Sequence, residues 1–147
     1  MRYFKSFCKF KHMKQVVCAL IIHEGKLLIT QHGAHTGHPL SWEFPGGKIQ
    51  EGEIPEQALI REILEELDIS ISVDIALQPV EYQYPGKTIW LIPFICRWTS
   101  GEIELREHND SLWIDPGDVF SHDMLPADFR MLQAADNFTQ LLQYSGK

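Results

Sequence analysis

The sequence predicts a single α+β domain in which a mixed β-sheet is sandwiched between α-helices. Its 147 residues suit one compact domain with one hydrophobic core. Strand-like apolar runs and helical patterns follow one another in the order strands, helix, strands, helix. The chain contains no internal repeat, low-complexity tract or linker. We therefore expect one domain at residues 13–147, preceded by a flexible extension at residues 1–12.

The first part of the chain has the features of a hairpin, a loop and a short strand. The expected strands are residues 16–22, 26–30 and 42–44. Glu24-Gly25 predicts the hairpin turn, and residues 31–41 predict a polar loop because they contain two glycines and a proline. Pro45-Gly46-Gly47 is a strong breaker and is expected to end the short strand.

The last part of the chain predicts further strands and a closing helix. The expected strands are residues 69–75, 80–84, 88–97 and 112–114. Pro85-Gly86 and Ser100-Gly101 predict turns, and Asp115-Pro116 predicts the cap and first residue of a short helix. A longer helix is expected over about residues 129–143, because apolar residues recur there at helical spacing. These apolar residues are Met131, Ala134, Ala135, Phe138, Leu141 and Leu142.

The helix expected over residues 55–67 has two different faces. Pro55 suits its first turn. At ~100° per residue, its apolar side chains form one stripe that we expect to be buried. They are Leu59, Ile60, Ile63, Leu64 and Leu67. A separate stripe is acidic, with Arg61 at its edge. It consists of Glu62, Glu65 and Glu66.

The acidic stripe has two interpretations. Like charges three and four positions apart cost a few tenths of a kcal/mol per pair, which a solvated helix face tolerates. Alternatively, the carboxylates bind a hard divalent cation, which prefers several oxygen ligands. Residues 44–48 favour the second interpretation, because two glycines let the backbone approach a ligand and Lys48 adds a cation.

This segment resembles the signature of the Nudix hydrolases, and within that family it resembles the MutT branch. The signature positions are occupied by Gly47, Glu53, Arg61-Glu62-Ile63, Glu65-Glu66 and Asp68-Ile69. The one departure is Asp68, which stands where the family has glycine. Since that glycine serves the helix C-terminus and Asp tolerates the left-handed conformation, we expect the departure to affect the turn rather than the chemistry.

The resemblance implies a Nudix fold and a set of catalytic residues. Glu62 would be the general base, Arg61 would orient the carboxylates, and Glu53 would brace the loop or bind metal through water. The implied ligands of Mg²⁺ or Mn²⁺ are the Gly46 carbonyl, Glu62, Glu65, Glu66 and, in the loop before Trp113, Glu107 as a metal-binding or base carboxylate.

Substrate contacts are expected outside the acidic stripe. Lys48 is a candidate phosphate contact. Gln31 and His32 stand where MutT relatives often carry arginines that touch phosphate. Phe44 would pack near the base or in the core. Asp128 would face the base or cap a helix, and as a carboxylate it would favour N–H-rich bases.

The resemblance implies hydrolysis of a nucleoside triphosphate, (d)CTP or oxidised dGTP, to the monophosphate and pyrophosphate by attack at the β-phosphorus. The alternatives are a Nudix hydrolase of a nucleotide-sugar or dinucleotide, and a non-catalytic nucleotide-binding module of the same fold. A zinc site at His32, His35 and His38 is disfavoured because their loop is glycine-rich and has no cysteine.

Composition excludes several other classes. A net charge of −7 argues against stable binding to nucleic acid. No apolar run approaches the ~18 residues of a membrane span. Residues 1–12 lack the features of a secretory signal, although a membrane-touching or partner-docking arm is an alternative. Three cysteines without a C-x-x-C pair fit a reducing cytoplasm. Nothing in the sequence specifies an oligomeric state.

Overall fold

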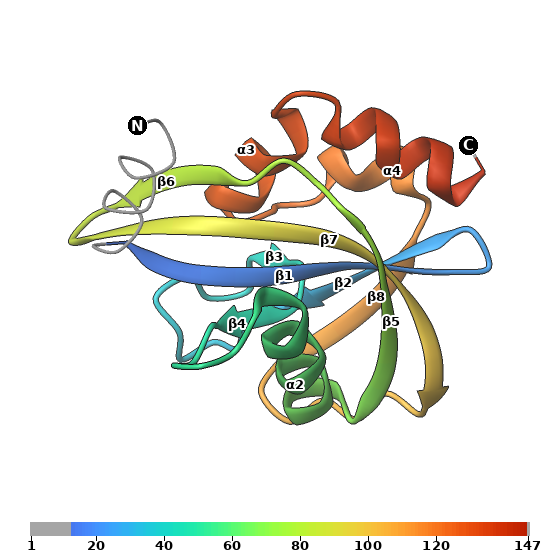
Figure 1. Ribbon diagram of the computed structural model, residues 1–147, viewed down its shortest axis with the longest axis horizontal. Helices are drawn as coiled ribbons and strands as arrows, with labels where there is room; N and C mark the ends of the chain where they lie inside the picture. Colours follow the sequence, from blue (N-terminus) through green and yellow to red (C-terminus); the bar gives the residue numbers. More distant parts are fainter. Residues whose placement is uncertain (1–12, 147) are drawn as a thin grey trace.

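The computed structural model describes residues 13–146, so the extension expected at residues 1–12 lies outside the described residues. The domain is built from strands, two α-helical layers and one 3-10 helix, η1 (Figure 1). In chain order the elements are β1 (Lys14–His23), β2 (Lys26–Gln31), β3 (Trp42–Glu43), β4 (Gly46–Lys48), α2 (Pro55–Leu67), β5 (Ile69–Ala76), β6 (Val80–Tyr84), β7 (Lys87–Gly101), β8 (Asp110–Ile114), η1 (Pro116–Ser121), α3 (Pro126–Gln133) and α4 (Asn137–Ser145).

The sheet is mixed, which confirms the expected fold class. Its central path runs β3-β2-β1-β7-β5, while β4 pairs with β1, β6 with β7 and β8 with β2. β1 and β7 are parallel over a long register, and the other pairs are antiparallel. In Figure 1, α2 lies on one side of the sheet and the C-terminal helices lie on the other.

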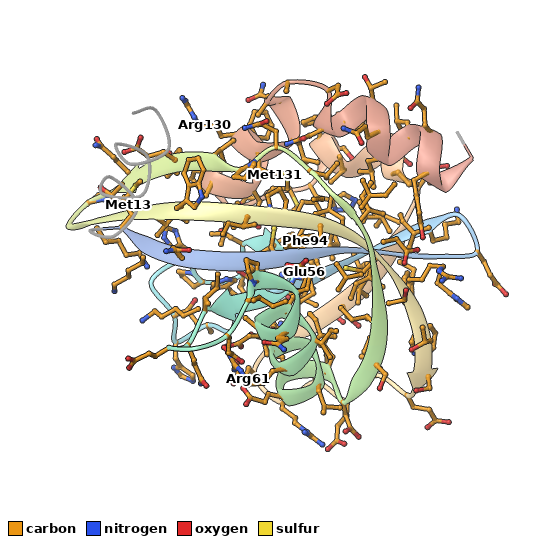
Figure 2. The ribbon with its side chains drawn as sticks, viewed as in Figure 1. Met13, Glu56, Arg61, Phe94, Arg130 and Met131 are labelled. Carbon is orange, nitrogen blue, oxygen red and sulfur yellow. The ribbon has the colours of Figure 1, made fainter. Side chains whose placement is uncertain are left out.

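The continuous apolar run of β1 is explained by burial on both faces of the sheet. Alternate residues such as Val17 and Ile21 pack in the core beneath α2, whereas Cys18 and Leu20 pack beneath the C-terminal helices. Met131 lies by the C-terminal helices (Figure 2), whereas Phe94 packs in the core beneath α2.

The expected buried stripe of α2 is partly wrong. Leu59, Ile63 and Leu67 are fully buried, but Ile60 is 42% exposed and Leu64 is 48% exposed. The helix is rolled toward its acidic side, so that Glu66 lies inside the buried arc and is only 5% exposed. The carboxylates of this helix therefore face the protein as well as solvent.

The end of α2 shows why aspartate replaces the usual glycine. Asp68 adopts the left-handed conformation with φ 58°, and its backbone N–H donates to the Leu64 carbonyl. Aspartate is one of the few residues that tolerate this conformation, so the expected helix end is confirmed.

The single helix expected over residues 129–143 is wrong, because the chain forms α3 and α4 with a break between them. Ala135 has φ 46° in the break. The fully buried Asn137 donates from Nδ2 to the Met131 carbonyl at 2.8 Å and accepts the Gln78 N–H at 2.8 Å. These contacts satisfy backbone groups that a continuous helix would not need to expose.

Three smaller regions complete the comparison with the sequence. The two glycines of the expected breaker Pro45-Gly46-Gly47 lie in strand β4, which pairs with β1. The turn expected at Ser100-Gly101 is instead the end of β7, paired with β5. Asp115 caps η1 as expected, accepting the Gly117 N–H at 3.0 Å.

Within residues 13–146, no helix is long and apolar enough to cross a membrane.

Candidate active site

Two adjacent glycines let β4 pass close to both β1 and α2. A side chain on Gly46 would overlap the Val17 carbonyl, and one on Gly47 would overlap the Glu62 carboxylate. Gly46 therefore has no room for a side chain because it meets backbone, whereas a side chain at Gly47 would displace the Glu62 carboxylate. The backbone of β4 and the acidic side of α2 consequently form one surface.

Arg61 holds the neighbouring carboxylates and the loop before α2 together. Its Nε donates to Glu53 at 2.7 Å, and one terminal nitrogen donates to Glu62 at 3.0 Å and Glu65 at 3.2 Å. The other donates to the Lys48 carbonyl at 3.1 Å. Glu53 also accepts the Gln50 N–H at 2.8 Å. The hydrogen bond from Arg61 lowers the pKa of Glu53 and keeps it ionised.

Glu66 is the least satisfied group of the acidic stripe. Its Oε2 is buried and has no hydrogen-bond partner within the described residues. Burial, together with the charges of Glu43, Glu107 and Glu62, raises the pKa of Glu66 to about 9. Burial also raises the pKa of Glu62. Such a carboxyl group must take up either a proton or a cation.

The surroundings of Glu66 fit a hard divalent cation. A cavity of about 130 Å³ is lined by Glu43, Glu66 and Glu107, so Glu107 is brought beside the acidic stripe. Oxygen donors of this kind suit Mg²⁺ or Mn²⁺. In the part of the chain that the structure describes, no three acidic, His or Cys side chains already converge as a metal would require. Arg61 instead holds Glu62 and Glu65 in this state.

Glu43 and His108 belong to this site, and sequence reasoning missed both. Glu43 Oε1 lies 2.9 Å from His108 Nε2, and Oε2 lies 2.6 Å from His32 Nε2. Burial alone would raise the pKa of Glu43, but contacts with His108 and His32 lower it overall. The hydrogen bond to Glu43 raises the pKa of His32. The one signal in the sequence was a glutamate between two aromatic residues of a short strand.

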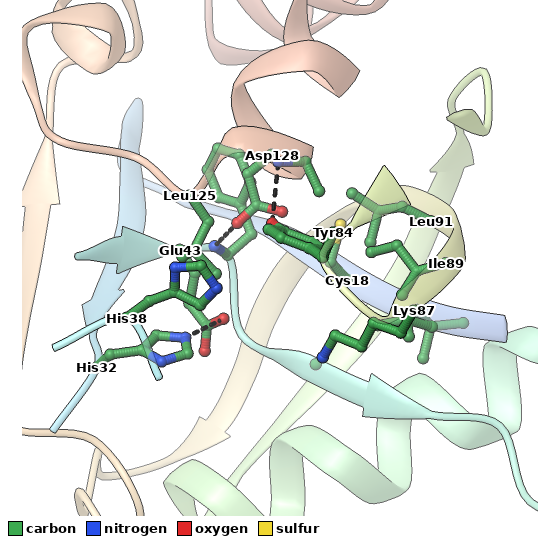
Figure 3. A pocket seen from close by; sticks show the side chains of 15 residues that line it. Cys18, His32, His38, Glu43, Tyr84, Lys87, Ile89, Leu91, Leu125 and Asp128 are labelled. Carbon is green, nitrogen blue, oxygen red and sulfur yellow. Dashed lines mark hydrogen bonds and ion pairs between the residues drawn. The ribbon is translucent and has the colours of Figure 1, made fainter. Parts of the chain in front are cut away.

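A second cavity, of about 180 Å³, opens on the other side of Glu43 (Figure 3). Its walls are mostly apolar, and Asp128 is its buried charged group. The residues that line it include Cys18, His32, His38, Glu43, Phe44, Tyr84, Lys87, Ile89, Leu91, Leu125 and Asp128. His32 and Glu43 line both cavities and form the wall between them.

Asp128 is held by the strand that carries Glu43. Its Oδ2 accepts the Phe44 N–H at 3.1 Å. Asp128 is only 5% exposed. Burial, and then the charge of Glu43, raises the pKa of Asp128 well above its usual value. The expectation that Asp128 caps a helix is wrong, because α3 begins at Pro126 with Leu125 as its cap residue.

The remaining expected substrate contacts are Phe44, Gln31 and Lys48, and of these only Phe44 lines one of the two cavities. Phe44 is buried and lines the larger one. Gln31 has both ends of its amide engaged, with Leu40 and Asn109. Lys48 is exposed and lines a separate surface hollow.

The three histidines of the first loop do not converge as zinc ligands. His32 turns to Glu43, and His38 makes an edge contact with the Tyr84 ring.

Comparison with known proteins agrees with this geometry. Residues 11–135 match the NUDIX domain family. The chain is 33% identical over 122 residues to a CTP pyrophosphohydrolase of Escherichia coli, covering 83% of this chain and 90% of that protein. It is 31% identical over 130 residues to an 8-oxo-dGTP diphosphatase of Haemophilus influenzae, covering 88% and 96%.

A solved structure extends the likeness to three dimensions. The solution structure of the E. coli ORF135 protein superposes with a TM-score of 0.74 at 31% identity. The match covers 89% of this chain and 91% of that one. The chain belongs to the Nudix hydrolase family, in its MutT-like branch.

Proposed function

We propose that this enzyme hydrolyses a nucleoside triphosphate to the monophosphate and pyrophosphate, using Mg²⁺ or Mn²⁺. The observation that carries the proposal is the position of Glu66. Its unpartnered, buried oxygen faces a carboxylate-lined cavity, and a pocket suited to a base lies across the Glu43 wall. Nudix hydrolases generally use a divalent metal.

In this proposal Glu62, Glu65, Glu66 and Glu107 hold the metal together with the Gly46 carbonyl. A bound metal would neutralise the phosphate charge and, as a Lewis acid, activate a water molecule. Glu62 accepts the proton of the attacking water, because its raised pKa makes it a better base than an ordinary carboxylate. Arg61 and Glu53 keep the carboxylates in place through their hydrogen bonds.

The triphosphate would extend from the larger cavity past His32 toward α2, with attack at the β-phosphorus. His32 suits a phosphate neighbour, since the raised pKa favours its cationic form over more of the neutral range. Lys48 and Gln31 remain proposed phosphate contacts, for which Lys48 would reach from its separate hollow and the Gln31 amide would leave Leu40 and Asn109. Phe44 would pack against the base from the floor of the cavity.

Asp128 is the proposed reader of the base. When ionised it accepts from the amino and imide N–H groups of guanine or 8-oxoguanine, and when neutral it can accept from the cytosine amino group and donate to cytosine N3. Cytosine, guanine and 8-oxoguanine offer an amino group, whereas uracil and thymine present carbonyl oxygens beside a single N–H. We therefore propose that CTP, dCTP or 8-oxo-dGTP is preferred over UTP and dTTP. The names of the two relatives given above support this choice.

The decisive experiment is a substrate panel with Mg²⁺ and quantified products. The expected result is pyrophosphate and monophosphate from CTP, dCTP or 8-oxo-dGTP, with slower release from UTP and dTTP. Faster cleavage of a nucleotide-sugar or a dinucleotide would replace the proposal with that alternative. Binding of nucleotide without any product would identify a non-catalytic module, for which the buried, unpartnered Glu66 would have no use.

We also propose that the enzyme acts in the cytoplasm without stable binding to nucleic acid. The net charge of −7 opposes association with a polyanion. Cys18 and Cys96 are buried free thiols, as expected in a reducing compartment.

A further inference from the structure

The segment between β7 and β8 carries Glu107 and is anchored at its beginning to α2. The Glu104 N–H donates to the Leu67 carbonyl at 2.9 Å, and the Arg106 N–H donates to the Glu66 carbonyl at 3.2 Å. The Arg106 guanidinium also forms a 3.2 Å ion pair with Asp68. These contacts bring the segment to the C-terminal end of the acidic helix.

The same segment is anchored on its other side to β2 and β3. His108 Nε2 lies 2.9 Å from Glu43 Oε1, and the His108 side chain is only 5% exposed. Asn109 then donates from its backbone to the Gln31 carbonyl at 2.9 Å and from Nδ2 to Gln31 Oε1 at 2.7 Å. Glu107 therefore lies between an anchor on α2 and an anchor on the Glu43 wall.

The two anchors differ in what they fix. The Arg106 anchor joins the segment to the helix that carries Glu66 and would remain if His108 were changed. The His108 contact joins it to the strand that separates the two cavities. Glu107 is itself exposed, and within residues 13–146 its side chain makes no hydrogen bond or ion pair. Its direction is thus set by the backbone on either side, and His108 is the adjacent buried contact.

We propose that His108 is a positioning residue, which clamps the β7–β8 segment to Glu43 so that the Glu107 carboxylate faces Glu66. The inference rests on the proposed function, because it assigns Glu107 to the metal-binding carboxylates. It also gives Glu43 a structural role, as the carboxylate to which His108 attaches the segment.

The clamp predicts a specific pattern of defects. Loss of the His108 contact frees Glu107 but leaves Glu62, Glu66 and the base pocket in place. Metal binding and turnover should fall, while nucleotide KM should change little. Changes to groups that orient metal ligands typically cost about 10- to 100-fold in metal affinity or activity.

The test compares His108→Ala with His108→Gln. Glutamine can place an amide N–H near the position of Nε2 and keep the contact with Glu43. His23→Ala is the matched control, since His23 is a partly buried histidine in ring contact with Trp98 and outside both cavities. Mn²⁺ alone is titrated into each metal-free protein by calorimetry, and kcat and KM are measured at saturating Mg²⁺.

His108→Ala should weaken Mn²⁺ binding about ten-fold and lower kcat about ten-fold, with KM within about two-fold. His108→Gln should recover most of both losses, and His23→Ala should match the parent. Parental Mn²⁺ binding and kcat in His108→Ala would overturn the inference. So would a loss of Tm alone, or equal defects in the Ala and Gln variants.

Failure of the proposed function would have a different signature. In that case the parent would release no pyrophosphate from any triphosphate. The Mn²⁺ titrations do not depend on turnover, so a weaker Mn²⁺ affinity in His108→Ala, restored in His108→Gln, would still support the clamp.

Discussion

The two cavities that meet at Glu43 are built in different ways. The carboxylate cavity takes Glu66 from α2, Glu43 from β3, Glu107 and His108 from the β7–β8 segment, and His32 from the loop before β3. The larger cavity is assembled from β1, β3, β6, β7, α3 and the loop before β3, and each contributes one or a few side chains. The first is rich in charge, and the second is mostly apolar around one buried carboxyl group.

Under the proposed function, the carboxylate cavity serves the reaction and the larger cavity serves substrate selectivity. Helical spacing fixes the relative positions of Glu62, Glu65 and Glu66, whereas Glu43 and Glu107 come to the site from β3 and the β7–β8 segment. The base pocket depends on the packing of many elements. Substitutions can alter it without disturbing α2, and changes on the two sides of the wall should have separable effects.

The largest expected effect comes from removing the metal. Activity should be lost in EDTA and return with Mg²⁺ or Mn²⁺, because the clustered carboxylates cannot neutralise phosphate charge themselves. Metal should also raise Tm by binding the folded state. Scanning calorimetry with and without Mg²⁺ measures this, and Glu66→Gln should reduce the shift. Full turnover in metal-free buffer would contradict the assignment of the carboxylate cavity.

The next effect is on the proposed base. Glu62→Gln should lower kcat by about 10²-fold or more while the protein stays folded, because its carboxylate lies against Arg61 and Gly47 rather than in the core. Circular dichroism and steady-state kinetics measure the two properties. Glu56→Gln, an exposed glutamate in the first turn of the same helix, is the control and should be active. Parental kcat in Glu62→Gln would remove Glu62 from the mechanism.

On the other side of the wall, Asp128→Ala should change selectivity more than rate. An unpaired polar group costs about 1–3 kcal/mol, so the parent should prefer dCTP or 8-oxo-dGTP over dTTP by roughly ten- to hundred-fold in kcat/KM. The variant should flatten this preference. Asp118→Ala, an exposed aspartate of η1, should keep it. Equal kcat/KM for the three substrates in the parent would show that Asp128 does not read the base.

The smallest effect is a pH trend in that selectivity. The pKa of Asp128 is raised, so its carboxyl group is neutral below that pKa and ionised above it. The neutral form can donate to cytosine N3 and accept from its amino group, whereas the ionised form suits the two N–H donors of 8-oxoguanine. The ratio of kcat/KM for 8-oxo-dGTP to that for dCTP should therefore rise with pH. Using a ratio cancels pH effects on the metal site. A constant ratio in the parent, or the same trend in Asp128→Ala, would contradict this assignment.

The sequence by itself determined the fold class and the acidic stripe of α2, of which Glu66 lines the carboxylate cavity. Residues 47–69 contain the glycines, Arg61 and the acidic stripe at fixed spacing on one helix. The left-handed end at Asp68 was likewise predictable, because few residues adopt that conformation. These features depend on residues that are close together in the sequence, so the sequence was enough to predict them.

The tertiary structure decided everything that depends on distant contacts. Periodicity placed Ile60 and Leu64 in the core, but packing against the sheet rolled α2 toward Glu66. The break between α3 and α4 follows from Asn137 bonding to Gln78, 59 positions away. The Glu43–His108 contact spans 65 positions and joins strand β3 to the segment between β7 and β8. Sequence spacing reports which side chains share a helix face, whereas packing alone decides what that face meets.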